Sequence, residues 1–241
     1  MPLRLYDRPL DAPIRLRDGT WRTAGLATTW RRYAPLARVA GITRIAELTG
    51  LDTLGVPVFA AIRPLGRSLS TQQGKGLTAE AARVSALMES LETYSAEHVT
   101  LPTLRASARA LGDRAVDVRR LARPRGRLDR DARWRWVEGW DVVRDRAVLV
   151  PAQAVTLDTT FRGPPVFDVS STGVASGNDL VEAILHGLCE VLERDAEAAW
   201  RRAGGDRRLV LDTIADPACQ ALIAQITRTG ARVVLWDLGG D

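Results

Sequence analysis

Hydrophobic residues recur at helical spacing in two long segments of the chain, and each segment follows a polar loop that contains glycine. The pattern predicts helices over residues 78–98 and 180–202, preceded by loops over 66–76 and 159–178. Thr78 stands where the first helix begins, and its side chain is of the type that caps helix N-termini. The two long helices are therefore expected to begin in similar settings.

Shorter apolar runs bounded by turn residues predict β-strands between and after these helices. The predicted strands span 42–47, 56–62, 134–140, 147–154, 209–212 and 232–237. Shorter helices are predicted over 29–34, where Pro35 ends the helix, and over 214–229. The remaining predictions are a helix plus loop over 101–132 and turns at 18–19 and 144–145.

The two long helices and the loops before them are related by an offset of 101 residues. Identical residues pair at this offset: Gly76 with Gly177, Ala82 with Ala183, Leu87 with Leu188, Glu89 with Glu190, Leu91 with Leu192, and Glu92 with Glu193. The spacing is too long for a solenoid repeat. We therefore expect two related loop–helix units placed side by side.

Composition narrows the class of protein. The chain has 241 residues, of which 46% are hydrophobic and 26% charged, as is ordinary for a globular protein. No apolar run approaches the roughly 20 residues of a membrane helix, and the N-terminus has no apolar core of a secretory signal. Two cysteines exclude a disulfide framework. These features together predict a cytoplasmic protein.

The net charge of +5 raises the question of nucleic-acid binding. Lys75 is the single lysine among 34 basic residues, so the excess is one of arginine and reflects composition. The arginines are interleaved with aspartates, as in RLDRDARWRW, and form no continuous basic stripe. We therefore expect no nucleic-acid partner.

Both long helices carry an acidic face. The glutamates are Glu89 and Glu92 on the first helix and Glu182, Glu190 and Glu193 on the second. At about 100° per residue, the last three fall within an arc of about 80° that also contains His186. Two solvated acidic faces are the simplest interpretation. However, the first face neighbours Ala82 and Ser85 rather than Lys or Arg, so another group could approach it closely.

Five carboxylates gathered at one place would repel one another unless cations neutralised them. Oxygen ligands select Mg²⁺ or Ca²⁺, and Mg²⁺ typically binds one or two carboxylates together with phosphate oxygens. The segment Gln73-Gly74-Lys75-Gly76, before a helix start, offers N–H groups and a cation for a phosphate. It is not a Walker A motif. The acidic faces and this loop predict a site for Mg²⁺ and phosphate.

Two segments resemble the signature regions of YcaO proteins. They are SLSTQQGKGLTAEAARVSALMESLETYSAEH and STGVASGNDLVEAILHGLCEVLERDA, and the resemblance extends over about residues 18–237. It implies a single α+β domain over 1–241, with mixed sheets flanked by helices. The nucleotide site would lie between two related units, about 42–100 and 134–202.

The resemblance also implies roles for particular residues. Mg²⁺ would be held by Glu89, Glu92, Glu182, Glu190 and Glu193, and ATP would be bound by Lys75, Asn178, Arg194 and Arg22. Glu190, Glu193 and Arg194 would serve in catalysis, with Arg194 suited to a phosphate charge. His186 could assist proton transfer, although a lone helical histidine is more often structural.

The implied activity is ATP-dependent activation of a peptide backbone amide. A nucleophile adds to the carbonyl, the γ-phosphoryl group moves to the resulting oxygen, and phosphate leaves. A Cys, Ser or Thr side chain of the peptide gives azoline cyclodehydration, whereas external sulfide gives thioamidation. Such reactions belong to the biosynthesis of ribosomal peptide products such as bacteriocins, or to protein modification. The phrasing GITRIAELTGLDTLGVPV resembles members that work with a TfuA-like partner, and the family also implies a homodimer.

The chain departs from the family in two places. Family members usually run longer, and the ending WDLGGD resembles the middle of a motif, so a C-terminal region is expected to be lacking. The segment after Thr20-Trp21-Arg22 also lacks the expected Ser-Pro-Glu-Glu. A catalytically silent scaffold, or a module that binds a precursor peptide, is therefore the alternative to an active enzyme.

Overall fold

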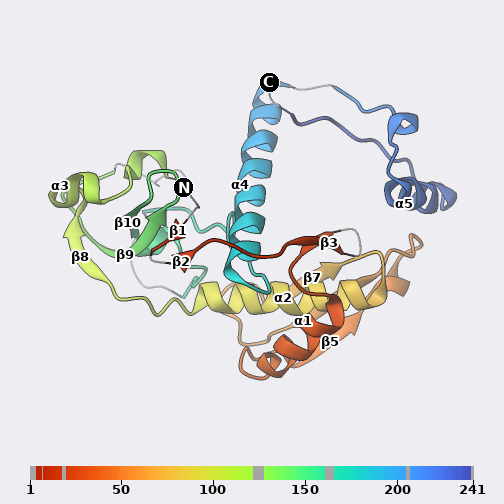
Figure 1. The fold of residues 1–241 in the computed structure, drawn as a ribbon, viewed down its shortest axis with the longest axis horizontal. Coiled ribbons are helices and arrows are strands. Elements are labelled where there is room, and N and C mark those ends of the chain that lie inside the picture. The colour runs from red at the N-terminus through yellow and green to blue at the C-terminus, as the bar shows by residue number, and fades with distance from the viewer. Residues whose placement is uncertain are drawn as a thin grey trace.

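The computed structural model describes residues 4–6, 8–17, 20–121, 128–160, 166–204 and 207–239. The turn expected at 18–19 lies outside these ranges. The N-terminal arm contains two short hairpins and leads into a helix. Its elements are β1 (Arg4–Leu5), β2 (Arg8–Pro9), β3 (Arg15–Arg17), β4 (Thr20–Arg22), α1 (Leu26–Tyr33) and a 3₁₀ turn (Ala34–Ala37) that contains Pro35. In Figure 1 the arm passes the lower end of α4 (Leu180–Ala203) before it reaches α1.

The first sheet has the strand order β5-β6-β7 and supports helix α2 (Ala79–Glu97). Its strands are β5 (Arg44–Glu47), β6 (Val58–Ile62) and β7 (Thr71–Lys75). Thr78 caps α2, because its side chain accepts a hydrogen bond from the Ala81 N–H. The small residues Ala82 and Ala86 pack on Phe59 and Ala61 of β6, which brings the helix close to the sheet.

Strand β7 corrects the loop expected over 66–76. Its residues pair with β6 in an antiparallel ladder, from Val58 opposite Lys75 to Ile62 opposite Thr71. Exposed and buried positions alternate along it, with Gln72 and Gly74 facing inward. The strand was hidden in the sequence because neither inward residue is a typical apolar strand former.

The second sheet has the order β10-β9-β8 and lies beyond the C-terminal end of α2, at the left of Figure 1. Its strands are β8 (Leu104–Ser107), β9 (Arg133–Asp141) and β10 (Arg146–Pro151), and the short helix α3 (Ala108–Leu111) follows β8. Its core is built around the buried Trp136, whose indole N–H donates to the Ala106 carbonyl. Within 101–132, where helix plus loop was expected, residues 104–107 are thus a strand.

The sheets are antiparallel in every ladder between the described strands. Among the described residues, parallel pairing is limited to one isolated bridge, between Ala115 and Leu149. The expected mixed character of the sheets rests on this bridge. The turn expected at 144–145 joins β9 to β10: the Asp141 carboxylate accepts the N–H groups of Val143 and Arg144. The expected combination of separate helices and sheets is present.

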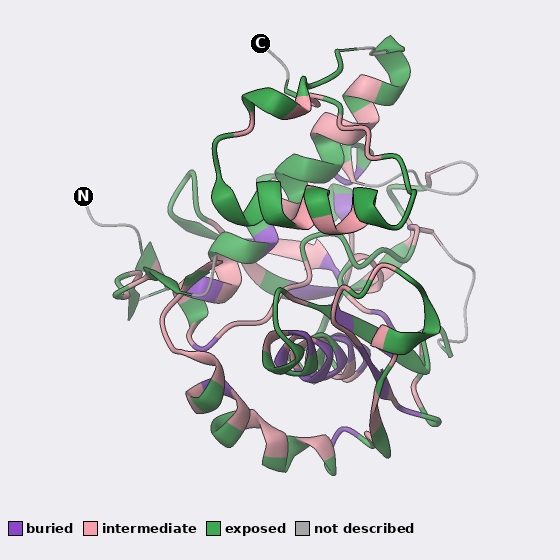
Figure 2. Cartoon of the chain, turned by 90° about the vertical axis from the view of Figure 1, so that its right-hand side faces the viewer, coloured by how far each residue is buried: buried purple, intermediate pink, exposed green. Residues whose placement is uncertain are grey.

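Helix α4 begins as α2 does but is packed very differently. Asp179 caps it by accepting the Glu182 N–H. Nine residues of α2 are buried, whereas in α4 the buried residues among those described are Glu182 and Gly187. Figure 2, in which α2 is seen end-on, shows the buried residues concentrated around that helix. No helix in the described part of the chain is long and apolar enough to cross a membrane.

The strands expected at 209–212 and 232–237 are not formed as such. These segments meet in one isolated antiparallel bridge, between Arg208 and Trp236. Residues Leu211–Thr213 instead form a 3₁₀ turn. A single pair of segments without a third strand offers little apolar surface to support a ladder. The helix expected between them is present as α5 (Pro217–Arg228).

Candidate functional site

The acidic faces of α2 and α4 lie near enough for the charge of Glu190 on α4 to act on glutamates of α2. The pKa of Glu92 is raised to about 7, chiefly by burial and then by the charges of Glu89 and Glu190, against two hydrogen bonds from Ser176 that lower it. Burial and then the Glu190 charge also raise the pKa of Glu89, while His186 and Lys75 lower it. The charge of a glutamate on α4 therefore influences the protonation of two glutamates on α2.

These three glutamates, Glu89, Glu92 and Glu190, form what we call the acidic junction. Its donors are hard oxygens, and the repulsion between them is what a divalent cation would relieve. Among the described residues, no three His, Cys, Asp or Glu side chains are arranged so that they could already hold one metal ion. The donor chemistry fits Mg²⁺, and binding would require the side chains to draw together.

Arg194 sits on α4 among three carboxylates. Its guanidinium nitrogens lie 3.6 Å from Glu190, 3.8 Å from Glu193 and 3.5 Å from Glu197. Glu193 is 63% exposed, and no described contact joins it to α2. Glu197 was not among the site residues predicted from the sequence, although its spacing from Arg194 and Arg201 is that of helical ion pairs.

Glu182 and Asn178 occupy a different environment, buried at the start of α4. The Glu182 carboxylate accepts hydrogen bonds from the Thr23 N–H at 2.9 Å and the Thr23 hydroxyl at 2.8 Å. It also accepts from Nδ2 of Asn178 at 3.2 Å, and Nε of Arg22 lies 3.7 Å away. Arg22 thus lies beside the predicted ligand Glu182.

Lys75 lies at the end of β7 with an exposed side chain. The phosphate cradle expected around it is altered by strand pairing, because the Gly76 N–H donates to the Pro57 carbonyl at 3.3 Å. Lys75 nevertheless acts on the pKa of Glu89, as does His186 on α4. The side chain of Lys75, rather than the backbone of Gly76, is therefore available to an anion.

The two glycines before the long helices have the same local role. A Cβ on Gly76 would stand 2.7 Å from the nitrogen of Ala82, and a Cβ on Gly177 would stand 2.7 Å from that of Ala183. Both glycines therefore let the chain that precedes each helix pass close to the helix's first turn. This contact recurs at the offset of 101 residues seen in the sequence.

A cavity of about 360 Å³ adjoins the acidic junction. It lies between the end of α1, the second half of α2 and the loop at 174–177, and Glu92 and Ser176 form part of its wall. The other lining is largely apolar and includes Leu36, Met88 and Leu91. The acidic junction is thus open on one side to an apolar chamber.

Comparison with known proteins places the chain in a family. A sequence profile described as YcaO cyclodehydratase, ATP- and Mg²⁺-binding, matches residues 73–241. An uncharacterized protein of Mycobacterium tuberculosis strain H37Rv is 36% identical over 246 residues, covering 98% of this chain and 56% of the relative. A Rhizobium leguminosarum protein described as encoded in the tfuA 3′ region is 37% identical, covering 89% of this chain and 53% of its own length. The chain therefore spans about half the length of these relatives.

Two solved structures share the fold. The Methanopyrus kandleri YcaO structure, bound with AMPPCP and Mg²⁺, has a TM-score of 0.69 at 26% identity and covers 89% of this chain and 54% of that one. A heterocyclase in complex with substrate and cofactor has a TM-score of 0.75 at 22% identity, covering 90% of this chain and 34% of the other. Because the profile covers more than half of the sequence and the fold agrees, the chain belongs to the YcaO family.

Proposed function

We propose that this chain forms the nucleotide-binding part of an ATP- and Mg²⁺-dependent enzyme that activates a peptide backbone amide. The observation that carries the proposal is the acidic junction, in which the charge of Glu190 on α4 raises the pKa of Glu89 and of Glu92 on α2. The Methanopyrus YcaO that shares the fold holds AMPPCP and Mg²⁺, which gives the junction a ligand class.

The residues have separable roles in this proposal. Glu89, Glu92 and Glu190 would bind Mg²⁺, with Glu193 and Glu182 as the further ligands predicted from the sequence. Bound Mg²⁺ would neutralise charge on the triphosphate and on the transferring phosphoryl group. Arg194, Lys75, Arg22 and Asn178 are proposed to position the nucleotide. Arg194 would exchange its carboxylate partners for a phosphate oxygen, since guanidinium pairs well with both.

The proposed reaction transfers the γ-phosphoryl group to an amide oxygen. The nucleophile forms a bond to the carbonyl carbon, and the oxygen then takes the phosphoryl group from ATP, leaving ADP. The carbon–oxygen bond breaks and phosphate departs with both electrons. In azoline formation the side-chain nucleophile and the amide nitrogen lose their protons, whereas in thioamidation the sulfide loses its protons and the amide nitrogen keeps its own. The protein's contribution is to align the two reactants and to exclude water.

The cavity beside Glu92 is proposed to receive part of the peptide. Its volume of about 360 Å³ admits one large side chain, and its apolar lining favours a hydrophobic one. The relative named for the tfuA 3′ region supports a TfuA-like partner, and hence thioamidation over azoline formation. A homodimer, and a place in the biosynthesis of bacteriocin-like peptides, are part of the same proposal.

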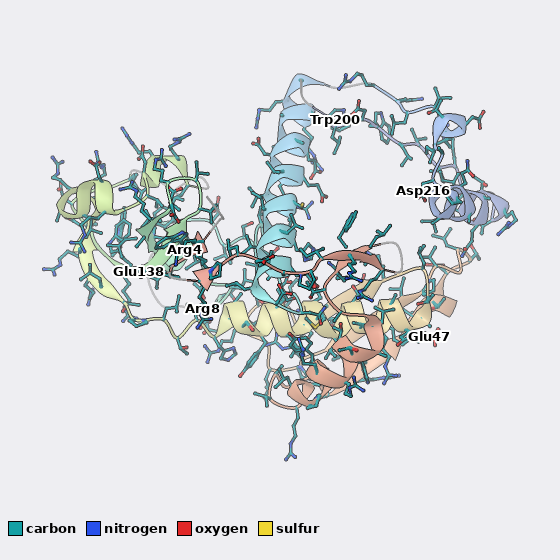
Figure 3. All side chains as sticks on the ribbon, in the orientation of Figure 1. Arg4, Arg8, Glu47, Glu138, Trp200 and Asp216 are labelled. Atoms are coloured by element: carbon teal, nitrogen blue, oxygen red, sulfur yellow. The ribbon has the colours of Figure 1, made fainter. Side chains whose placement is uncertain are left out.

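A silent scaffold is the second candidate, because the carboxylates of the described residues form no preassembled metal site. Titration calorimetry with AMPPCP, with and without Mg²⁺, separates the two candidates. We expect Mg²⁺-dependent binding that weakens at least tenfold in Glu190→Gln. Glu138→Gln is the matched control, because Glu138 lies on the second sheet away from α2 and α4 (Figure 3). If neither the wild type nor the control binds AMPPCP, the scaffold is the correct function.

A further inference from the structure

Side chains from the N-terminal arm and α1 contact the backbone just before α4. The Tyr33 hydroxyl donates to the Gly177 carbonyl at 3.1 Å, and Nη1 of Arg32 donates to the Asn178 carbonyl at 2.9 Å. These partners lie about 145 residues apart in the chain. The two carbonyls precede the first turn of α4, so the contacts fix the direction in which that helix leaves its loop.

Thr29 sets the orientation of the Asn178 amide. Its hydroxyl donates to Oδ1 of Asn178 at 2.8 Å, and Nδ2 of the same amide donates to Glu182. All three side chains are buried, with exposed fractions of 5%, 9% and 4% for Thr29, Asn178 and Glu182. A carboxylate accepts only, so the amide nitrogen must face Glu182, and Oδ1 must then find its donor on the other side. Thr29 supplies that donor.

Thr23 completes the connection at the other end. Its N–H and hydroxyl both donate to Oε2 of Glu182. The hydrogen bonds therefore run from Thr29 through Asn178 to Glu182 and back to the arm at Thr23. In the described part of the chain, Thr29 is the one residue of α1 that is buried. The side chain that this helix turns inward therefore makes a polar contact.

We infer that Thr23, Thr29, Arg32 and Tyr33 form an N-terminal clamp that positions the start of α4, and with it the acidic junction, for ligand binding. Glu190 lies two turns beyond Glu182 on the same rigid helix, so a shift at the first turn is carried to the junction. These four residues precede the segment matched by the family profile. The inference rests on the proposed function only for its nucleotide readout.

The experiment compares Thr29→Val, which keeps the shape and removes the hydroxyl, with Thr29→Ser, which restores the donor. Mg²⁺–AMPPCP affinity is measured by calorimetry, and hydrogen exchange is measured over residues 20–33 and 177–186. We expect Thr29→Val to bind about tenfold more weakly, because the buried Oδ1 of Asn178 loses its donor. Exchange should rise in both segments. Thr29→Ser should resemble the wild type.

Thr156→Val is the matched control. Thr156 is half-buried and donates to the Ala96 carbonyl at the far end of α2, so it should leave affinity and exchange unchanged. If Thr29→Val does not fold, Tyr33→Phe removes a second clamp donor without removing the ring. We expect Tyr33→Phe to bind about threefold more weakly, with faster exchange over residues 177–186.

Several results would overturn the clamp. Wild-type affinity and unchanged exchange over 177–186 in Thr29→Val, or in Tyr33→Phe where the first variant does not fold, would do so. Equal weakening in Thr29→Val, Thr29→Ser and Thr156→Val, in step with lower melting temperatures, would show general loss of structure instead. If the wild type itself fails to bind AMPPCP, the proposed function fails. The clamp is then decided by exchange alone, with faster exchange over 177–186 supporting it and unchanged exchange refuting it.

Discussion

Gly74 of β7 lies directly against Ala86 of α2, with no room for a side chain between them. A Cβ on Gly74 would stand 2.0 Å from the Ala86 nitrogen and 2.3 Å from the Ala82 carbonyl oxygen. Both neighbours are backbone atoms of a regular helix, so they cannot move aside as a flexible side chain would. This contact sets the distance between the first sheet and the helix that carries Glu89 and Glu92.

We therefore expect Gly74→Ala to destabilise the protein by about 3 kcal/mol, because an overpacked backbone contact must be relieved by moving α2. Urea unfolding monitored by circular dichroism measures the change. Gly50→Ala is the control, since a Cβ at Gly50 meets nothing within 4 Å and the residue has no positive φ. Equal stability of the two variants would show that the helix is not held at this distance.

The sequence predicted the elements whose burial is periodic and apolar. Helix α2, with its Thr78 cap, follows from that pattern, as do β6 and β9. Strand β7 does not follow from the pattern, because its inward positions are the polar Gln72 and the small Gly74 rather than apolar residues. The C-terminal strands were wrong for the opposite reason: their apolar residues suit a strand, but the segments meet in a single bridge.

Some residues of the candidate site could likewise be predicted from the sequence, and others could not. Helical arithmetic places Glu89 and Glu92 on one face, and the structure brings them to Glu190. No periodic signal marks Thr29, because one hydroxyl that meets an amide 149 positions later leaves no pattern along the chain. Contacts of this kind depend on the assembled fold and are found only when the distant segments are placed together.

The raised pKa of Glu92 makes stability depend on pH. Burial and the charges of Glu89 and Glu190 hold this pKa at about 7, above its usual value of 4.5. The folded protein therefore binds a proton that the unfolded chain has released, so stability is lost as the pH rises from about 4.5 through 7. Without Mg²⁺, Glu92→Gln should be more stable than the wild type by about 1–2 kcal/mol at pH 8, after allowance for partial solvent screening.

The measurement is urea unfolding at pH 5 and pH 8 in the presence of a chelator. At pH 5 the advantage of Glu92→Gln should be much smaller, because Glu92 is then largely protonated in the folded protein. Glu138→Gln, at an exposed strand position, should show no gain at pH 8. A wild type that is as stable as Glu92→Gln at pH 8 would contradict the raised pKa.

A buried ion pair secures the end of α2. Nη2 of Arg63 lies 2.5 Å from Glu97, and the Ser68 N–H and hydroxyl donate to the other carboxylate oxygen. Burial raises the pKa of Glu97, but the hydrogen bonds from Ser68 and Arg63 outweigh it and hold that pKa below its usual value. The pair therefore ties the loop after β6 to the last turn of the helix.

Removing one partner should leave the other charge buried and unpaired. We expect Glu97→Ala to lower the free energy of unfolding by about 3–5 kcal/mol, as for other broken buried pairs. Asp131→Ala, which breaks the exposed pair with Arg109, should lower it by less than about 1 kcal/mol. Guanidinium or urea unfolding of both variants tests this contrast, and similar losses in the two would mean that Glu97 is solvated in solution.

The two long helices should respond differently to the loss of equivalent leucines. Leu87 of α2 has no exposed surface, whereas Leu188 of α4, at the position 101 residues later, is 50% exposed. Leu87→Ala removes a fully packed side chain and should cost about 3 kcal/mol. Leu188→Ala removes one that already contacts water and should cost no more than about 0.5 kcal/mol. Urea unfolding measures both, and a loss for Leu188→Ala that approaches that of Leu87→Ala would mean that the face of α4 is covered in solution.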